Sequence, residues 1–215
     1  MNAVLERLRG GLVCTQAALA DLPAPRDPAP FRIREMDMTW PDDVAAWLEI
    51  HNDAFGRAWG TVDYTRAILG HPHIRVLHTF FVLAGDQPVG AASVGVYRAN
   101  PAVGVGHYLG FRRDARRHGL AKALVLHRYH ALAAHGISVA ESQTYLRHPE
   151  SLRIHFECGF RPKPRRDPWN NPDPAGPLAR LVTRHELDRL YARWAEAGSG
   201  NGHGAPLGRP VAWSR

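Results

Sequence analysis

Cysteine is scarce in this chain of 215 residues, which holds only Cys14 and Cys158. Two cysteines cannot form the disulfide framework that stabilises small secreted domains. Cys158 also lies in an apolar segment, where a small hydrophobic side chain fits. We therefore expect both thiols to be reduced and structural, in a cytoplasmic protein.

Long apolar runs and internal repeats are also missing. No segment approaches the roughly 18 consecutive apolar residues of a membrane-spanning helix. Near the N-terminus, Thr15 and Gln16 interrupt the apolar stretch that follows Arg7 and Arg9, which makes this segment a poor signal peptide. We expect a soluble protein without a membrane partner, and the lack of a repeat excludes a tandem architecture.

Lysine is the third scarce residue type. All of the 27 basic residues except Lys122 and Lys163 are arginine, and the net charge is +7. A balance this basic ordinarily indicates an acidic partner such as nucleic acid. However, the arginine skew accompanies abundant Ala, Gly and Pro, as is typical of a GC-rich genome, and a polyanion bound at 112–117 would neutralise part of the charge. We see no helix pattern typical of DNA reading, and we expect no nucleic-acid partner.

Hydrophobic residues make up 45% of the chain, which is enough for the core of one domain. Residues 3–20 have the pattern of a short helix, and the prolines within 23–30 then form a stiff linker in which a helix cannot continue. The sequence therefore predicts an N-terminal helix and linker over 1–30, a folded domain over 31–197 and a disordered Gly-rich tail over 198–215.

Hydrophobic spacing predicts alternating helices and strands within the domain. Asp42 or Asp43 is expected to cap a helix that carries Trp47 and Ile50, and residues 85–88 are typical of a hairpin turn. The expected strands cover 31–34, 78–84, 89–97, 103–111, 137–145 and 178–182. The further expected helices cover 61–69, 120–134 and 183–197, and the prolines between 162 and 177 predict an irregular loop.

The most informative segment is Arg116-Arg117-His118-Gly119-Leu120-Ala121, which follows an apolar run ending at Phe111 and opens a helix. The first helical turn carries backbone N–H groups without intrahelical partners, and the helix dipole adds partial positive charge there. A phosphate satisfies both. Gly119 lets the backbone approach a pyrophosphate closely, while Arg116 and Arg117 add attraction. This segment therefore predicts a phosphate-binding turn.

Further motifs surround this turn over residues 104–162. The strand ends at Phe111, the motif Arg116-x-x-Gly119-x-Ala121 opens the helix, a second apolar strand follows, and Cys158-Gly159-Phe160 closes the segment. In order and spacing, the segment resembles the GNAT N-acetyltransferase superfamily, and residues 31–103 resemble it more loosely. Phe111 and Arg113 replace the family's Val and Pro, a small change for a site that acts through its backbone.

The resemblance implies an α/β (α+β) fold whose mixed, mostly antiparallel central sheet is flanked by helices and splayed open at the acyl-CoA site. It implies transfer of an acetyl group from acetyl-CoA to an amine by direct attack, without a covalent enzyme intermediate. The pantetheine arm would pair with backbone at the end of the strand, and the pyrophosphate would bind the turn. The cofactor-binding candidates are Leu109, Phe111, Arg116, Arg117, His118, Gly119, Leu120 and Ala121, with His148 and Ser151 as weaker ones.

The resemblance also suggests catalytic residues. His107 lies four residues before Phe111, where some family members carry a catalytic histidine, and its ordinary pKa of about 6.5 suits a general base. The alternatives are a strand histidine satisfied by a carbonyl, or Glu141 acting as the base through water. Strand alternation places Tyr108 on the opposite face from His107, as a packing residue. His155 stands where many family members have a Tyr that reaches the thioester sulfur, which makes it the candidate acid.

The acceptor pocket of this fold is usually shaped by the loop between the first two helices and by the segment after the closing Gly-Phe. Aromatic residues beside charges in these segments point to Phe55, Trp59 and Trp169 as substrate-binding candidates. An equally good account is that the two tryptophans cover the edge of the core. No metal is expected, because His71 and His73 have no third ligand at suitable spacing.

Three functions follow from these observations. We favour an N-acetyltransferase that uses acetyl-CoA and a small-molecule amine and acts as a monomer or homodimer. The second is an acyltransferase that uses another acyl-CoA or a protein amine, which an open acceptor groove would indicate. The third is an Arg-rich nucleic-acid-binding or regulatory module, which predicts strongly salt-dependent DNA binding without acetyl-CoA.

Overall fold

The fold is described over residues 12–26, 28–116, 118–145 and 148–162 in a computed structural model of the chain. Contacts between residues divide the chain into two compact units. The larger unit comprises Cys14–Gln143 and Ile154–Lys163, and the smaller comprises Met1–Val13, Thr144–Arg153 and Pro164–Arg215. The three candidate catalytic residues and the predicted phosphate turn belong to the larger unit.

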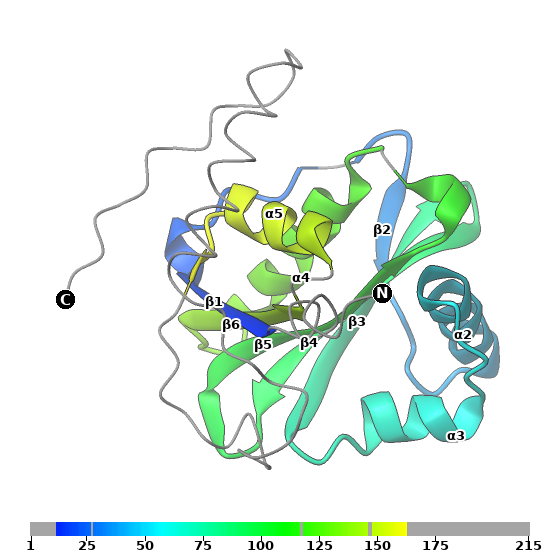
Figure 1. The fold of residues 1–215 in the computed structure, drawn as a ribbon, viewed down its shortest axis with the longest axis horizontal. Helices are drawn as coiled ribbons and strands as arrows, with labels where there is room; N and C mark the ends of the chain where they lie inside the picture. The colour runs from blue at the N-terminus through cyan, green and yellow to red at the C-terminus, as the bar shows by residue number, and fades with distance from the viewer. Residues whose placement is uncertain (1–11, 27, 117, 146–147, 163–215) are drawn as a thin grey trace, which may run out of the picture. The chain divides into compact units, whose positions relative to one another are not determined.

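The larger unit is built on a seven-stranded sheet with the strand order β2-β3-β4-β5-β6-β1-β7 (Figure 1). The strands are β1 Leu12–Ala18, β2 Arg32–Glu35, β3 Ile74–Ala84, β4 Gln87–Tyr97, β5 Asn100–Phe111, β6 Val139–Tyr145 and β7 Arg161–Pro162. Neighbours are antiparallel from β2 to β5 and between β1 and β7, whereas β5 and β6 are parallel. This mixed, mostly antiparallel sheet confirms the predicted fold class.

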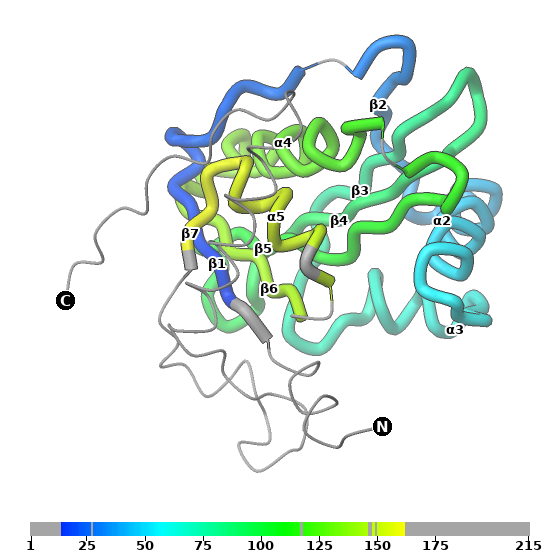
Figure 2. Tube along the Cα trace, turned by 45° about the horizontal axis from the view of Figure 1, so that its top comes forward, coloured from blue at the N-terminus to red at the C-terminus, as the bar shows by residue number. Residues whose placement is uncertain are grey.

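Helices cover both faces of the sheet. They are α2 Pro41–Phe55, α3 Thr61–Tyr64, the π-helical turn η2 Thr65–Leu69, α4 Leu120–Ala133 and α5 Pro149–Glu157, with short 3-10 turns η1 Leu19–Asp21 and η3 Arg113–Ala115. Figures 1 and 2 show α2 and α3 on one face and α4 on the other. Each face has its own hydrophobic cluster: Trp47, Ile50 and Phe81 belong to the cluster on the α2 face, and Val94, Leu124 and Phe160 to that on the α4 face.

The sheet opens between β5 and β6, as expected for this fold class. The parallel register joins Val103 to Val139 and ends where Val105 meets Glu141. β5 continues to Phe111 while pairing with β4 on its other side. Beyond Val105, the described residues of β6 pair no further with the edge of β5 that faces away from β4.

The predicted strands at 31–34, 78–84, 89–97, 103–111 and 137–145 and the helix at 120–134 all appear, with ends shifted by a few residues. The predicted hairpin turn is Gly85–Asp86, where Gly85 has a φ of 60° that favours glycine. The helix at 61–69 is present as α3 followed by η2.

The predicted helix over 3–20 is wrong where the structure describes it. Residues 12–18 form β1, which lies beside β7 with Thr15 opposite Pro162 (Figure 2). The segment contains Val13 and Thr15, and β-branched residues favour strands. Ala17 also joins the hydrophobic cluster on the α4 face. The predicted domain range of 31–197 stays a prediction, although β1 adds residues before it to the sheet.

The predicted capping of α2 by Asp42 or Asp43 is also wrong. Trp40 is the N-cap residue and makes no side-chain capping bond. The carboxylate of Asp43 instead accepts hydrogen bonds of 2.6 and 2.8 Å from the guanidinium of Arg34 and one of 2.9 Å from the backbone of Asp37. Asp43 therefore joins α2 to β2.

The described part of the smaller unit comprises the ends of β1 and β6 and the start of α5. The backbone N–H of His148 donates to the carbonyl of Tyr145 at 2.9 Å, and the carbonyl of His148 accepts from Ser151 at 3.1 Å. The predicted strand at 178–182, the helix at 183–197 and the tail at 198–215 lie outside the described residues. Over the described ranges, no helix is long and apolar enough to cross a membrane.

Candidate active site

The predicted phosphate turn joins η3 to α4. Gly119 is the N-cap residue of α4 and has φ 73° and ψ −1°, a left-handed conformation that favours glycine. A Cβ atom added at Gly119 would meet no atom within 4 Å. The described residues thus leave room beside Gly119, and backbone N–H groups at the start of α4 can bind an anion there.

Side chains of the turn have different surroundings. Arg116 donates from Nε to the carbonyl of Phe111 at 3.3 Å and from Nη2 to the carbonyl of Ala54 at 3.1 Å. Arg116 therefore ties the turn to the end of β5 and to α2. Leu120 is buried in the core, so any role in anion binding rests on its backbone. His118 is exposed, with its ring 6.0 Å from that of Phe31, and Arg117 lies outside the described residues.

A bulge interrupts β5 at Tyr108. Ala92 of β4 lies opposite Leu109, whereas the next residue, Ser93, lies opposite His107, so Tyr108 is the extra residue. Tyr108 has a φ of 42°, and among the described residues it is the only one other than glycine with positive φ. Such bulges bend a strand and redirect its side chains.

The bulge reverses the alternation of side chains along β5, so that odd-numbered residues point to opposite faces of the sheet before and after it. Before it, His107 bonds to η2 on the α2 side of the sheet. After it, Leu109 and Phe111 pack in the cluster on the α4 face. In a regular strand these three residues would share one face. The prediction that Tyr108 points away from His107 is also wrong, because their rings lie 4.3 Å apart, although Tyr108 does pack against the α2 cluster.

His107 is held by a backbone carbonyl through one ring nitrogen. Its Nε2–H donates to the carbonyl of Ala67 in η2 at 2.8 Å, which leaves Nδ1 as the basic atom. Burial lowers the pKa of His107 to about 3, and the nearby His71 and Arg128 contribute to the lowering. The ring is therefore neutral near pH 7 and is a weaker base than an ordinary histidine.

Glu141, the second candidate base, is buried on β6. Its Oε2 accepts a 3.2 Å hydrogen bond from the hydroxyl of Tyr97, which in turn accepts one of 3.0 Å from Gln143. The backbone carbonyl of Glu141 accepts from the hydroxyl of Tyr129 at 3.0 Å. Burial and the charge of Glu141 raise the pKa of Tyr97 well above its ordinary value, so Tyr97 stays a donor.

His155, the candidate acid, is buried next to Arg128 of α4. A guanidinium carries only donors, so Nη2 of Arg128 donates to Nε2 of His155 at 3.1 Å. His155 is therefore the Nδ1–H tautomer when neutral, and an acid role rests on that proton. Its ring meets that of Phe160 at 5.4 Å, edge to face.

Aromatic side chains gather around the bulge on the α2 side. Trp59 stacks on Trp47 with centroids 6.0 Å apart and meets Tyr108 edge to face at 5.5 Å. The side chain of Asn52 fixes the backbone of Trp59 through two hydrogen bonds of 2.8 and 3.0 Å. Phe55 is 37% exposed at the end of α2. We call Trp47, Trp59, Tyr108 and His51 the aromatic wall. Of the predicted substrate-binding residues, Trp59 belongs to this wall, Phe55 lies at the end of α2, and Trp169 lies outside the described residues.

His51 is a residue of this wall that the sequence did not single out. It is fully buried, its Nδ1–H donates to the carbonyl of Trp47 at 2.8 Å, and its Nε2 has no hydrogen-bond partner within the part of the chain that the structure describes. Burial lowers the pKa of His51 to about 4. Its only sequence signal is a position four residues after Trp47, on the buried face of a helix.

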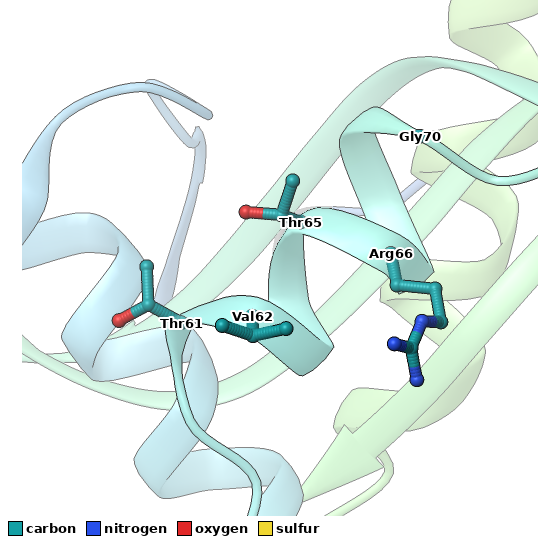
Figure 3. Close-up of a pocket in the computed structure, with 5 residues that line it drawn as sticks. All are labelled: Thr61, Val62, Thr65, Arg66 and Gly70. Carbon is teal, nitrogen blue, oxygen red and sulfur yellow. The ribbon is translucent and has the colours of Figure 1, made fainter.

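A hollow of about 360 Å³ lies on the segment formed by α3 and η2. Figure 3 shows its lining by Thr61, Val62, Thr65, Arg66 and Gly70, all from this segment or its end. The hollow is open to solvent, and neither an imidazole nor a carboxylate lines it. The same segment, η2, supplies the carbonyl of Ala67 that holds His107.

The structure thus brings His107, Tyr108 and Trp59 together at the bulge, and β5 continues from the bulge into the turn at Gly119. Arg128 and His155 lie on the α4 side of the sheet. His148 and Ser151 belong to the smaller unit at the start of α5. Among the described residues, no group of three His, Cys, Asp or Glu side chains could hold a metal ion.

Comparison with known proteins identifies related folds. The profile of the Acetyltransferase (GNAT) family matches residues 44–160. No curated protein matches the chain. A GCN5-related N-acetyltransferase from Sphaerobacter thermophilus is 20% identical with a TM-score of 0.54, and the match covers 75% of this chain and 53% of that one.

Two further solved structures are similar to this chain. A GNAT-family protein from Novosphingobium aromaticivorans DSM 12444 is 18% identical with a TM-score of 0.52, over 71% of this chain and 60% of that one. A tandem GNAT protein from the clavulanic acid biosynthesis pathway is 18% identical with a TM-score of 0.56, over 71% and 50%. The chain therefore spans about half to three-fifths of these proteins, and at these identities the likeness shows a shared fold.

Proposed function

Because this chain belongs to the Acetyltransferase (GNAT) family, an acyltransferase family that generally uses acetyl-CoA, we propose that it transfers an acetyl group from acetyl-CoA to the amine of a small molecule. The observation that supports this best is the course of β5. One strand carries the bulge beside the aromatic wall and ends at Phe111, from which η3 leads to the turn at Gly119. A donor held by its phosphates at the turn would thus lie along the strand that presents His107.

The residues present fit a CoA ester. The open space at Gly119 suits a pyrophosphate, which would be held by the backbone N–H groups at the start of α4. The edge of β5 beyond Val105, where Leu109 and Phe111 lie, would pair with the pantetheine arm. When bound, acetyl-CoA supplies a thioester carbonyl for attack and a thiol leaving group.

We assign the acceptor amine to the α2 side of the sheet, where Trp59 and Phe55 provide apolar contact. There, Nδ1 of His107 is the basic atom that takes the amine proton. An amine becomes acidic as its bond to the acyl carbon forms, so a base of low pKa can accept the proton at that stage. Glu141 acting through water is the competing assignment. His155 would donate a hydrogen bond from Nδ1–H to the departing thiolate, which then takes a proton from solvent.

Release of free thiol from acetyl-CoA over a library of amines tests this function. We expect CoA to raise the melting temperature, since a ligand that binds only the native state stabilises it, and we expect turnover with small amines above that with peptides. Turnover with peptides alone would instead indicate a protein acceptor. No stabilisation at millimolar CoA, together with no thiol release, would contradict the proposal.

The remaining parts of the proposal concern the setting of the enzyme. We expect a cytoplasmic monomer or homodimer, and its size-exclusion mass with and without CoA tests the oligomeric part. A dimer whose formation depends on CoA would still agree with this expectation, whereas a larger assembly would contradict it.

A further inference from the structure

Arg128 occupies an unusual position for an arginine. It lies on α4 one turn after Leu124 and one turn before Leu132, both fully buried, and is itself only 2% exposed. Among the ion pairs formed by the described residues, none includes Arg128. Burying a cation away from a counter-charge is costly unless its donors are bonded. Burial of Arg128 is therefore explained only by interactions that an apolar side chain at this position could not make.

Two hydrogen bonds of Arg128 are made at the bulge of β5, whereas its buried Nε has no hydrogen-bond partner among the described residues. Nη1 donates to the carbonyl of Tyr108 at 3.1 Å and to that of Ser93 at 3.2 Å. Ser93 is the β4 residue at which the register shifts, and Tyr108 is the extra residue of β5. The two carbonyls thus belong to the two strands that the bulge separates, and one guanidinium nitrogen binds both.

Tyr108 needs such a restraint. Its φ of 42° is sparsely populated by residues with a side chain, and surrounding contacts must hold it there. The hydrogen bond from a buried, charged donor is among the stronger ones available to a carbonyl.

Gly106 is suited to the same arrangement. An added Cβ there would overlap the hydroxyl of Tyr129 and lie 2.7 Å from Nη2 of Arg128. The strand therefore leaves room for the guanidinium, whose Cζ lies 4.8 Å from the centre of the Tyr129 ring.

We propose that Arg128 is a positioning residue of the acyl-transfer site, whose guanidinium locks the Tyr108 bulge and thereby directs His107 toward the acceptor and the end of β5 toward the CoA ester. Through Nη2 it also fixes the tautomer of His155. The inference rests on the proposed function for its catalytic consequence, but the clamp on the bulge does not depend on it.

The test compares Arg128→Met, which keeps the length and removes the donors, with Arg128→Lys. A displacement of about 1 Å at reacting groups can lower a rate about a hundredfold. We therefore expect Arg128→Met to lower kcat by about that factor and to raise KM for acetyl-CoA by a smaller factor, because the end of β5 shifts while the turn at Gly119 is kept. Arg128→Lys should recover part of kcat, because an ammonium can donate to one of the two carbonyls.

Leu132→Ala is the matched control, because it damages the same buried face of α4 without touching the bulge. It should lower the melting temperature at least as much as Arg128→Met and keep kcat near that of the wild type when measured well below melting. An equal loss of kcat in both variants would mean that Arg128 acts only through stability and would overturn the inference.

A double-mutant cycle with Tyr108→Gly isolates the clamp. Glycine adopts positive φ without strain, so the bulge should then need Arg128 less. We expect Arg128→Met to lower kcat far less in the Tyr108→Gly background than in the wild-type background. The same loss in both backgrounds would overturn the inference.

A spectroscopic measurement separates the clamp from the proposed function. The carbonyl carbon of Tyr108, labelled with ¹³C, should shift in Arg128→Met and stay unchanged in Leu132→Ala. If the wild type releases no thiol with any amine, the proposed function fails while this comparison still decides whether Arg128 holds the bulge. An unchanged carbonyl resonance in Arg128→Met would overturn the clamp itself.

Discussion

The phosphate turn offers the sharpest test of cofactor binding, through Gly119→Glu. An added Cβ meets no atom of the described residues within 4 Å, so the main folding cost that we expect is that of the positive φ of 73°, about 1–2 kcal/mol for a residue with a Cβ. The carboxylate would lie where a pyrophosphate approaches. Two unit charges about 4 Å apart repel by about 1 kcal/mol in water and about 4 kcal/mol near a protein surface, so the affinity for CoA should fall about fivefold to a thousandfold.

Gly136→Glu provides a matched control at the opposite end of α4. Gly136 has a φ of 71° and likewise meets no atom within 4 Å of an added Cβ. The two variants therefore carry the same added charge and the same backbone strain. Isothermal titration with CoA should show the loss only for Gly119→Glu, and both variants should unfold cooperatively at similar urea concentrations. Equal CoA affinities in the two folded variants would refute the assignment of the turn.

Two further predictions concern histidines on the α2 side of the sheet. His107→Ala should lower kcat about a hundredfold and leave the Kd for CoA unchanged. Because the pKa of His107 is about 3, the acidic limb of the wild-type kcat/KM profile should lie well below pH 6. Unchanged turnover in His107→Ala, with a loss in Glu141→Gln, would assign the base to Glu141. His51 binds its proton less readily in the folded state, with a pKa near 4, than in the unfolded state. The stability that it contributes is therefore present above pH 6.5 and is lost as pH falls toward 4, by about 3 kcal/mol. Urea unfolding of His51→Phe should show a correspondingly flatter pH dependence, whereas exposed His73→Gln should match the wild type.

The turn and α4 could be predicted from the sequence because their signals are local. A glycine that needs positive φ and a helix with apolar residues at helical spacing depend little on the rest of the fold. Residues 12–18 form a strand where the sequence predicts a helix, because a short apolar run does not by itself distinguish the two. Its neighbour β7 lies well over a hundred residues away in the sequence, and local pattern carries no information on such pairing.

The catalytic surroundings were less predictable because they depend on the bulge. Alternation along β5 assumes a regular strand, and nothing in the run from His107 to Phe111 marks Tyr108 as an extra residue. The depressed pKa of His107 follows from burial under η2, which a sequence does not show. The position of Arg128 is visible in the sequence, because this charged residue interrupts the apolar helical face between Leu124 and Leu132.

The bulge also explains how one strand can serve two different surroundings. Gly106 approaches Arg128 and Tyr129 on the α4 side, whereas Gly110, an even number of residues later, approaches Ala54 and His51 on the α2 side. Without the extra residue, both glycines would face α4, and the large side chains of Leu109 and Phe111 would be directed at the tightly packed α2. The bulge thus lets β5 present His107 to the acceptor side and then anchor its end in the α4 core. Because the phosphate turn follows that anchored end, a change in the bulge should displace the base and the cofactor turn relative to each other.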